Sequence, residues 1–192
     1  MGTLATPNHV VWEYFFSLRR MAASAKAAES PELARQFAAL AIVMSVTVCE
    51  VFMNLWFRVR IEEVNDAEGR KQFLKDLSFP FLSLEKKLKQ WPKRYLGKEI
   101  DFSSGPGAAF VALKKTRNRI IHFTSTHETF TFENVSIHGL ADTSEYDALG
   151  ATEAQNAVQT AETFVREVFR LAGIPIEQIG GMMHGWTGKI AV

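Results

Sequence analysis

Three side chains that could act on a phosphodiester stand close together in the segment 113–123: Arg117, Asn118 and His122. A histidine side chain titrates near neutrality, so it can take a proton or give one. A guanidinium is permanently charged and forks onto phosphate oxygens, and an amide can hold a hydroxyl group or orient an imidazole. Together these groups suit the attack of a ribose 2′-OH on its own 3′-phosphate without a metal.

These side chains are expected on the C-terminal half of a helix that begins near Pro106, a residue type that suits a first turn. Asn118 and His122 are four residues apart and lie one above the other, and Arg117 and His122 flank one groove without touching. Arg117 lies at the edge of the face that we expect to pack on the core. That core face consists of Ala109, Leu113, Thr116, Ile120 and Phe123. The second, mostly polar side keeps two apolar residues, Val111 and Ile121, and this indicates a second contact surface, such as another subunit.

The same residues also have a purely structural interpretation. Arg117 would form an ion pair with a neighbouring helix. His122 would lie at the helix C-terminus, where the helix dipole favours a cation. On residue types alone this interpretation is the simpler one.

The stretch from Arg117 through Asn118 to His122 resembles the signature of the HEPN domain superfamily, all-helical domains with an Arg, a polar residue and a His near the end of a late helix. The resemblance implies a metal-independent endoribonuclease whose site forms where two subunits pair their motifs. It carries over Arg117, Asn118 and His122 as the catalytic residues. Many members of the superfamily act as toxins, phage-defence effectors or RNA-processing nucleases, and some are inactive. The implied partners are therefore RNA, a second copy of the chain and an antitoxin or regulatory protein. Three further basic residues of the same helix are weaker candidates for RNA contacts: Lys114, Lys115 and Arg119.

Composition places the chain among globular proteins of one domain, 1–192. Hydrophobic residues make up 47% and charged residues 22%, and the formal net charge is +1. No overall basic character therefore indicates nucleic acid, and an RNA site would have to be a local patch. The single cysteine, Cys49, excludes a disulfide framework within one chain. The five histidines show no metal-ligand spacing, so neither a metal nor a cofactor is expected.

Two helices are expected first, over residues 8–29 and 31–64, the second beginning at a Ser-Pro-Glu restart. The middle of the second helix, 37–57, contains only one charge, Glu50, and is long enough to span a bilayer. A carboxylate in lipid costs roughly 2.5–3.5 kcal/mol, so we interpret the segment as the central helix of a soluble bundle. The membrane span is the alternative. A buried Glu50 needs a partner: Arg117 is one candidate, and another Arg or Lys is an equal one. In a HEPN-type site Glu50 is a weak supporting residue.

The rest of the chain predicts more helices around one insertion. Residues 83–95 form a basic helix in which Lys86, Lys87, Lys89, Lys93 and Arg94 alternate with Trp91 and Tyr95. Such a pattern can grip single-stranded RNA; the alternative is a solvated face over the stripe Leu84, Leu88 and Trp91. Residues 128–140 predict an irregular excursion or a short hairpin, and 143–150 a loop. Residues 151–172 form an amphipathic helix, and 173–192 a tail that lies over another surface or frays.

The expected fold class is thus all-α: a HEPN-like helical bundle with one long central helix and a short irregular or hairpin insertion after the motif helix. The leading hypothesis for function is a HEPN-type endoribonuclease that works as a homodimer, as a toxin or phage-defence effector. The alternative is a catalytically inactive helical module that binds a partner protein or a nucleotide. Because the sequence starts without a basic segment followed by an apolar one, a cytoplasmic protein is the default expectation.

Overall fold

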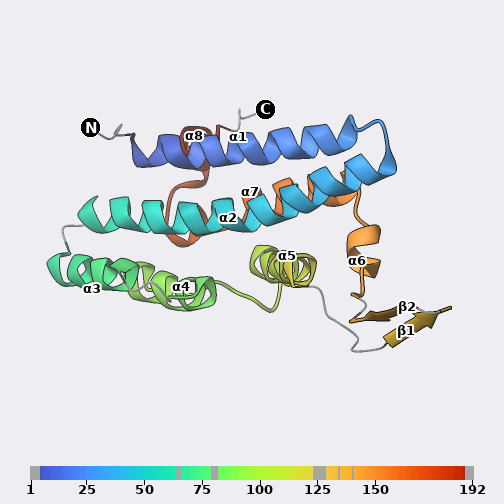
Figure 1. Ribbon diagram of the computed structural model, residues 1–192. Helices are drawn as coiled ribbons and strands as arrows, with labels where there is room; N and C mark the ends of the chain where they lie inside the picture. The colour runs from blue at the N-terminus through green and yellow to red at the C-terminus, as the bar shows by residue number, and fades with distance from the viewer. Residues whose placement is uncertain are drawn as a thin grey trace.

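The computed structural model describes residues 5–63, 66–78, 82–122, 129–133, 135–139 and 141–188. Of these residues 77% are helical, in eight α-helices and one short π-helical turn, and 5% lie in a two-stranded hairpin. The expected all-α class is therefore confirmed. In Figure 1 the long helices lie roughly parallel to one another, and the hairpin projects from one end of the bundle.

The first two helices form a helical hairpin, α1 (Pro7–Lys26) and α2 (Pro31–Glu63). The restart between them follows the prediction, because the Ser30 hydroxyl accepts a hydrogen bond from the Leu33 backbone N–H at 3.2 Å. The predicted apolar spacing of α1 is buried as expected: Val11, Phe15, Leu18 and Ala22.

Helix α2 is the central element of the bundle and packs against α1, α7 and α5 (Figure 1). It is the one helix in the described part of the chain that is long and apolar enough to cross a membrane, and 56% of its most apolar stretch is buried inside the protein. Large side chains such as Phe52 and Phe57 are fully buried there. This burial is what the core helix of a soluble bundle requires.

Helices α3 (Ala67–Ser78) and α4 (Leu84–Trp91) cover one half of α2 (Figure 1). Helix α4 continues into a π-helical turn (Pro92–Leu96), which ends at Gly97 with a left-handed φ of 66°. Pro92 lacks the backbone N–H that would continue the α-helical pattern, and Gly97 adopts the left-handed conformation without strain. Trp91 is fully buried in the core, where its ring centroid lies 4.6 Å from that of Phe73 and 5.9 Å from that of Phe57.

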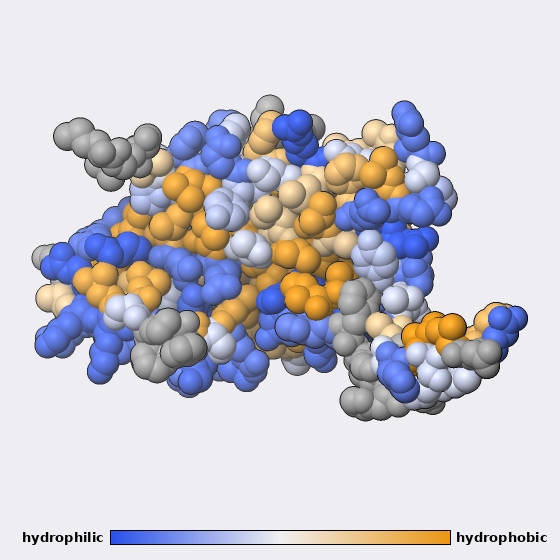
Figure 2. Space-filling view, viewed as in Figure 1, coloured by the Kyte–Doolittle hydropathy of each residue, from blue (hydrophilic) through white to orange (hydrophobic). Residues whose placement is uncertain are grey.

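The motif helix α5 (Gly105–Ile121) is followed by strands β1 (Thr129–Phe132) and β2 (Val135–His138). The predicted insertion is thus an antiparallel hairpin, in which Phe130 faces Ile137 and Phe132 faces Val135. These four apolar side chains share one face, and each is about half exposed or more. Figure 2 shows the resulting apolar patch on the hairpin. A short helix, α6 (Ser144–Asp147), lies within the segment that was predicted as a loop.

The last two helices, α7 (Ala151–Leu171) and α8 (Ile176–Thr187), close the bundle. All the predicted inward residues of α7 are buried, and Gly173 ends it with a φ of 76°. The predicted tail contains α8, which packs on α1 and α7 and buries Ile179, Met183 and Trp186. Arg19 of α1 connects the three helices, because its guanidinium donates to Glu162 of α7 at 2.9 Å and to the Thr187 carbonyl of α8 at 2.6 Å.

Candidate functional site

The core face of α5 agrees with the prediction at Leu113 and Ile120 and differs from it at Ala109 and Phe110. Phe110 is fully buried and stacks on Phe164 of α7, with 4.3 Å between the ring centroids. Leu113 packs against the same core, and Ile120 is buried. Ala109, which was predicted to face inward, is exposed. The helical spacing predicted Ala109 in the core face and did not include Phe110. A phenylalanine side chain gains far more free energy from burial than an alanine does.

The start of α5 is fixed against the segment that precedes it. A Cβ at Gly107 would lie 2.1 Å from the Asp101 carbonyl oxygen, so only a glycine allows this approach. The Asp101 carboxylate accepts hydrogen bonds from the Ser103 hydroxyl at 2.6 Å, the Ser104 hydroxyl at 2.7 Å and the Ser103 backbone N–H at 2.8 Å. These hydrogen bonds lower the pKa of Asp101 to about 2. The turn that carries Phe102 is therefore held in place.

Arg117 lies on the buried side of α5, in line with Phe110, Leu113 and Ile120. Its side chain is partly exposed, but the Nε atom is buried and has no hydrogen-bond partner among the described residues. No ion pair of Arg117 exists among the residues that the structure describes. The ion pair that the structural interpretation expected is thus not formed with this part of the chain.

Asn118 and His122 are exposed one turn apart at the C-terminal end of α5. The His122 backbone N–H donates to the Asn118 carbonyl at 2.9 Å, and His122 leaves the helical conformation with φ −114° and ψ 74°. The two side chains make no hydrogen bond with the described residues. The two positions are one helical turn apart, as predicted, and both side chains are exposed. One prediction, Phe123 in the core face, lies outside the described residues.

Glu50 does not pair with Arg117. Its carboxylate accepts a hydrogen bond from the ammonium group of Lys87 on α4 at 2.6 Å. The Lys87 side chain is only 10% exposed, so the pair closes the contact between α2 and α4. Of the two candidates that the sequence left open, the other basic residue is the correct one, and Glu50 has a structural partner away from the motif.

The basic helix over residues 83–95 is not an aromatic platform for RNA. Trp91 is fully buried, and Leu84 and Leu88 are buried beside it, as the alternative interpretation predicted. Tyr95 packs against the core. Most of the basic side chains are engaged in ion pairs: Lys87 with Glu50, Lys89 with Glu85, Lys93 with Glu99, and Arg94 with Asp76. Rings that are packed in a core cannot stack on bases.

The three basic candidates of α5 differ in their surroundings. Arg119 pairs with Glu145 of α6 at 2.6 Å, and Lys114 lies 3.6 Å from Glu85 of α4. Lys115 is exposed and has no ion pair within the described part of the chain. Lys115 is therefore the α5 lysine that remains available to an anion.

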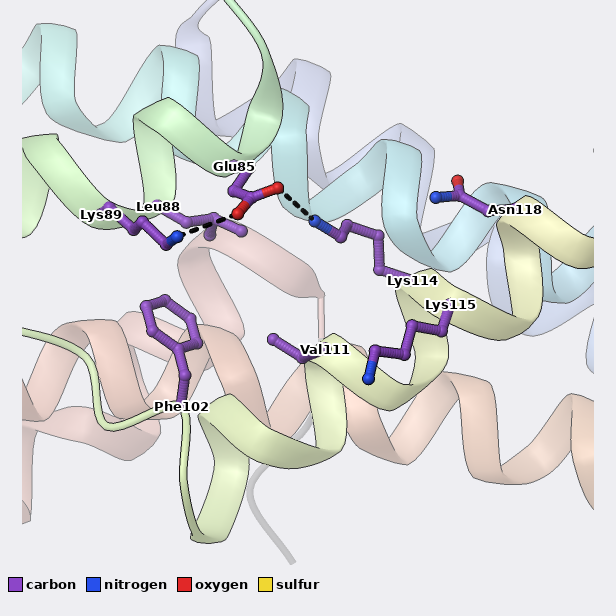
Figure 3. A pocket seen from close by; sticks show the side chains of 8 residues that line it. All are labelled: Glu85, Leu88, Lys89, Phe102, Val111, Lys114, Lys115 and Asn118. Atoms are coloured by element: carbon purple, nitrogen blue, oxygen red, sulfur yellow. Dashed lines mark hydrogen bonds and ion pairs between the residues drawn. The ribbon is translucent and has the colours of Figure 1, made fainter.

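A cavity of about 400 Å³ lies beside the motif, between α4, α5 and the turn that precedes α5 (Figure 3). Asn118, Lys114 and Lys115 line it, together with Lys89 of the predicted basic helix and four residues that the sequence did not indicate as RNA contacts: Glu85, Leu88, Phe102 and Val111. The signal in the sequence was the spacing 111, 114, 115 and 118, which places four side chains on one helical face. Val111, expected on a second contact surface such as a subunit interface, lines this cavity.

No family model, no curated protein and no solved structure matches the chain. An arginine and a histidine without partners in the described residues, with an amide between them, can bind a phosphate and move a proton.

Proposed function

We propose that the protein is a metal-independent endoribonuclease of the HEPN type. The observation that carries the proposal is that the fold leaves the side chains of Arg117, Asn118 and His122 without hydrogen bonds or ion pairs to the described residues. Their neighbours Lys114 and Arg119 on the same helix do have ionic partners. A buried guanidinium nitrogen without a partner costs stability, and a role in binding phosphate explains why the position holds an arginine.

The proposed reaction is an internal transesterification. A base removes the proton of the ribose 2′-OH, and the oxygen attacks the adjacent phosphorus. The bond from phosphorus to the 5′-oxygen of the next nucleotide breaks, and an acid protonates that oxygen. The products are a 2′,3′-cyclic phosphate and a 5′-OH. His122 supplies proton transfer, and Arg117 stabilises the negative charge of the phosphorane.

A second copy of the chain completes the proposed site, because one motif offers one histidine and the reaction needs both a base and an acid. Apolar surface close to the motif supports this arrangement. Ile121 is 44% exposed at the end of α5, and the apolar face of the hairpin β1–β2, which follows α5 in the chain, is also exposed. In a two-fold interface each of these residues would approach its own copy or a neighbour of it.

The test is cleavage of single-stranded RNA in EDTA by the wild type and by His122→Ala. The wild type is expected to cut and to leave cyclic phosphate ends, and His122→Ala is expected to lose at least about 100-fold in rate. His9→Ala, which changes an exposed histidine on α1, is the matched control and keeps full activity. A requirement for added metal, or an active His122→Ala, would contradict the proposal.

A toxin or phage-defence role belongs to the same proposal, with an antitoxin or regulatory partner and a cytoplasmic location. Its support is the resemblance of the motif alone. Induced expression in a bacterial host is expected to arrest growth with the wild type and not with His122→Ala. Equal growth of both strains at equal protein levels would count against this role.

The second candidate is an inactive helical module that binds another protein. The hairpin favours it, because Phe130, Phe132, Val135 and Ile137 form an apolar face that nothing in the described chain covers. A two-stranded hairpin alone is marginally stable in water, so a partner surface would stabilise it. Two results together would favour this candidate: the protein does not cleave RNA, and a bound partner protein protects the hairpin from proteolysis.

A further inference from the structure

The cavity between α4 and α5 has the size of a ligand site. Its volume of about 400 Å³ falls within the range of small-molecule pockets, roughly 300–1,000 Å³. It is next to Asn118, so it is continuous with the exposed end of the motif helix. Helix α4, the turn around Phe102 and helix α5 each contribute one side (Figure 3).

One part of the cavity wall is apolar. Leu88 comes from α4, Phe102 from the turn and Val111 from α5. Figure 3 shows the side chains of Phe102 and Val111 pointing toward one another. Phe102 is partly exposed while it packs against the core. A ring that is held by the core and open on one side can stack on a base, which the buried Trp91 cannot do.

The rest of the wall is positively charged. Three lysines, Lys89, Lys114 and Lys115, face one carboxylate, that of Glu85. Figure 3 shows Glu85 between Lys89 and Lys114. The carboxylate oxygens of Glu85 lie 2.9 Å from the Nζ atom of Lys89 and 3.6 Å from that of Lys114. The hydrogen bond from Lys89 and the charges of both lysines lower the pKa of Glu85, so it remains ionised at neutral pH. Lys115 has no ion pair among the described residues, so its ammonium group is available to a phosphate.

The apolar side of the cavity is formed before any ligand binds. The Asp101 hydrogen bonds fix the turn that holds Phe102, and the close approach at Gly107 fixes that turn against α5. A preformed site avoids the entropy cost of ordering a loop on binding.

We propose that this cavity binds one nucleotide of single-stranded RNA, with the base against Phe102 and the phosphate on Lys115. A flat apolar body that carries a negative charge is the chemistry that an aromatic ring and an unpaired lysine recognise together. Asn118 links the cavity to the motif, so the bound nucleotide is adjacent to the phosphate that is cut. This last statement rests on the proposed ribonuclease function; the binding itself does not.

Binding is measured with a fluorescein-labelled adenosine hexaribonucleotide and the His122→Ala protein, by anisotropy at fixed salt in EDTA. Phe102→Ala and Lys115→Glu are each expected to weaken binding by about tenfold or more. The matched controls are Phe16→Ala, which removes an exposed ring from α1, and Lys86→Glu, which makes the same charge change on the outside of α4. Both controls are expected to bind like the parent protein, and circular dichroism checks that all four variants are folded.

A second measurement separates a nucleotide site from a general attraction of anions. Unlabelled AMP is expected to displace the hexamer at lower concentration than ribose 5-phosphate does, because only AMP carries a base for Phe102. Equal displacement by both, or binding by Phe102→Ala and Lys115→Glu that equals the controls, overturns the proposal. Binding through the cavity by a protein whose wild type never cuts RNA would leave this inference standing and refute the proposed function. Cleavage that is unaffected by Phe102→Ala and Lys115→Glu would refute this inference and leave the proposed function standing.

Discussion

Replacement of Arg117 by methionine is expected to make the protein more stable and inactive. The Nε–H of Arg117 is buried and has no hydrogen-bond partner in the part of the chain that the structure describes. An unsatisfied buried donor costs about 1–3 kcal/mol. Methionine keeps an unbranched apolar stem in the row of Phe110, Leu113 and Ile120, and it is a good helix former.

The free energy of unfolding is therefore expected to rise by about 1 kcal/mol in Arg117→Met. In a chain of this length such a change raises the Tm by about 2–4 °C. The rate of RNA cleavage is expected to fall by about 100-fold or more, since the charge that stabilises the phosphorane is lost. Urea denaturation, a thermal melt and the metal-free cleavage assay measure the three quantities on one preparation.

The matched control is Arg119→Met, two residues along the same helix. Arg119 is 61% exposed and pairs with Glu145 at 2.6 Å. An exposed ion pair contributes at most about 1 kcal/mol, so a small loss of stability is expected in place of a gain. If the free energy of unfolding of Arg117→Met were lower than that of the wild type by more than about 1 kcal/mol, the guanidinium would have a structural role. That result would refute the expected gain in stability.

Three further predictions concern the surroundings of the motif. Ile121→Asp is expected to split the dimer and lower activity while each chain stays helical, because two carboxylates would meet near the axis; light scattering and circular dichroism test it, and a wild type that is monomeric at micromolar concentration yet fully active would contradict it. Gly107→Ala is expected to lower the free energy of unfolding by about 1–3 kcal/mol, because its Cβ would meet the Asp101 carbonyl at 2.1 Å; unchanged stability in urea would show that this approach is not needed. Asp101 has its folded pKa lowered to about 2, so its contribution to stability is present above the unfolded pKa of about 3.9 and is lost as the pH falls toward the folded value. The stability difference between the wild type and Asp101→Asn should therefore shrink between pH 5 and pH 2, and a constant difference would refute this.

The sequence alone determined the helices whose large apolar residues repeat at helical spacing. Phe15 and Leu18 of α1 and Phe164 and Val168 of α7 are all buried where the period predicts them. The reason is that apolar area dominates the free energy of burial, so a stripe of large side chains fixes which side of a helix faces inward. The helix start at Ser30 and the helix end at Gly173 could also be predicted, because each depends on the type of a local residue.

The rotation of the motif helix α5 could not be predicted from its sequence in this way. Its stripe contains small and polar residues, so the period did not fix its rotation, and the stacking of Phe110 on Phe164 decided it. That contact joins residues 54 positions apart in the chain. The consequence for the site is direct, because the rotation moves Arg117 from the edge of the core face onto it.

Other features of the site also depend on elements that are distant in sequence. Glu50 pairs with Lys87, 37 residues away, because α4 packs over that turn of α2. The cavity exists because Phe102, Leu88 and Val111 come from three different segments. The Gly- and Met-rich end forms α8 because α1 and α7 offer it a surface on which to bury Trp186. In each case the free energy comes from a contact between segments, and a pattern read along one segment cannot contain it.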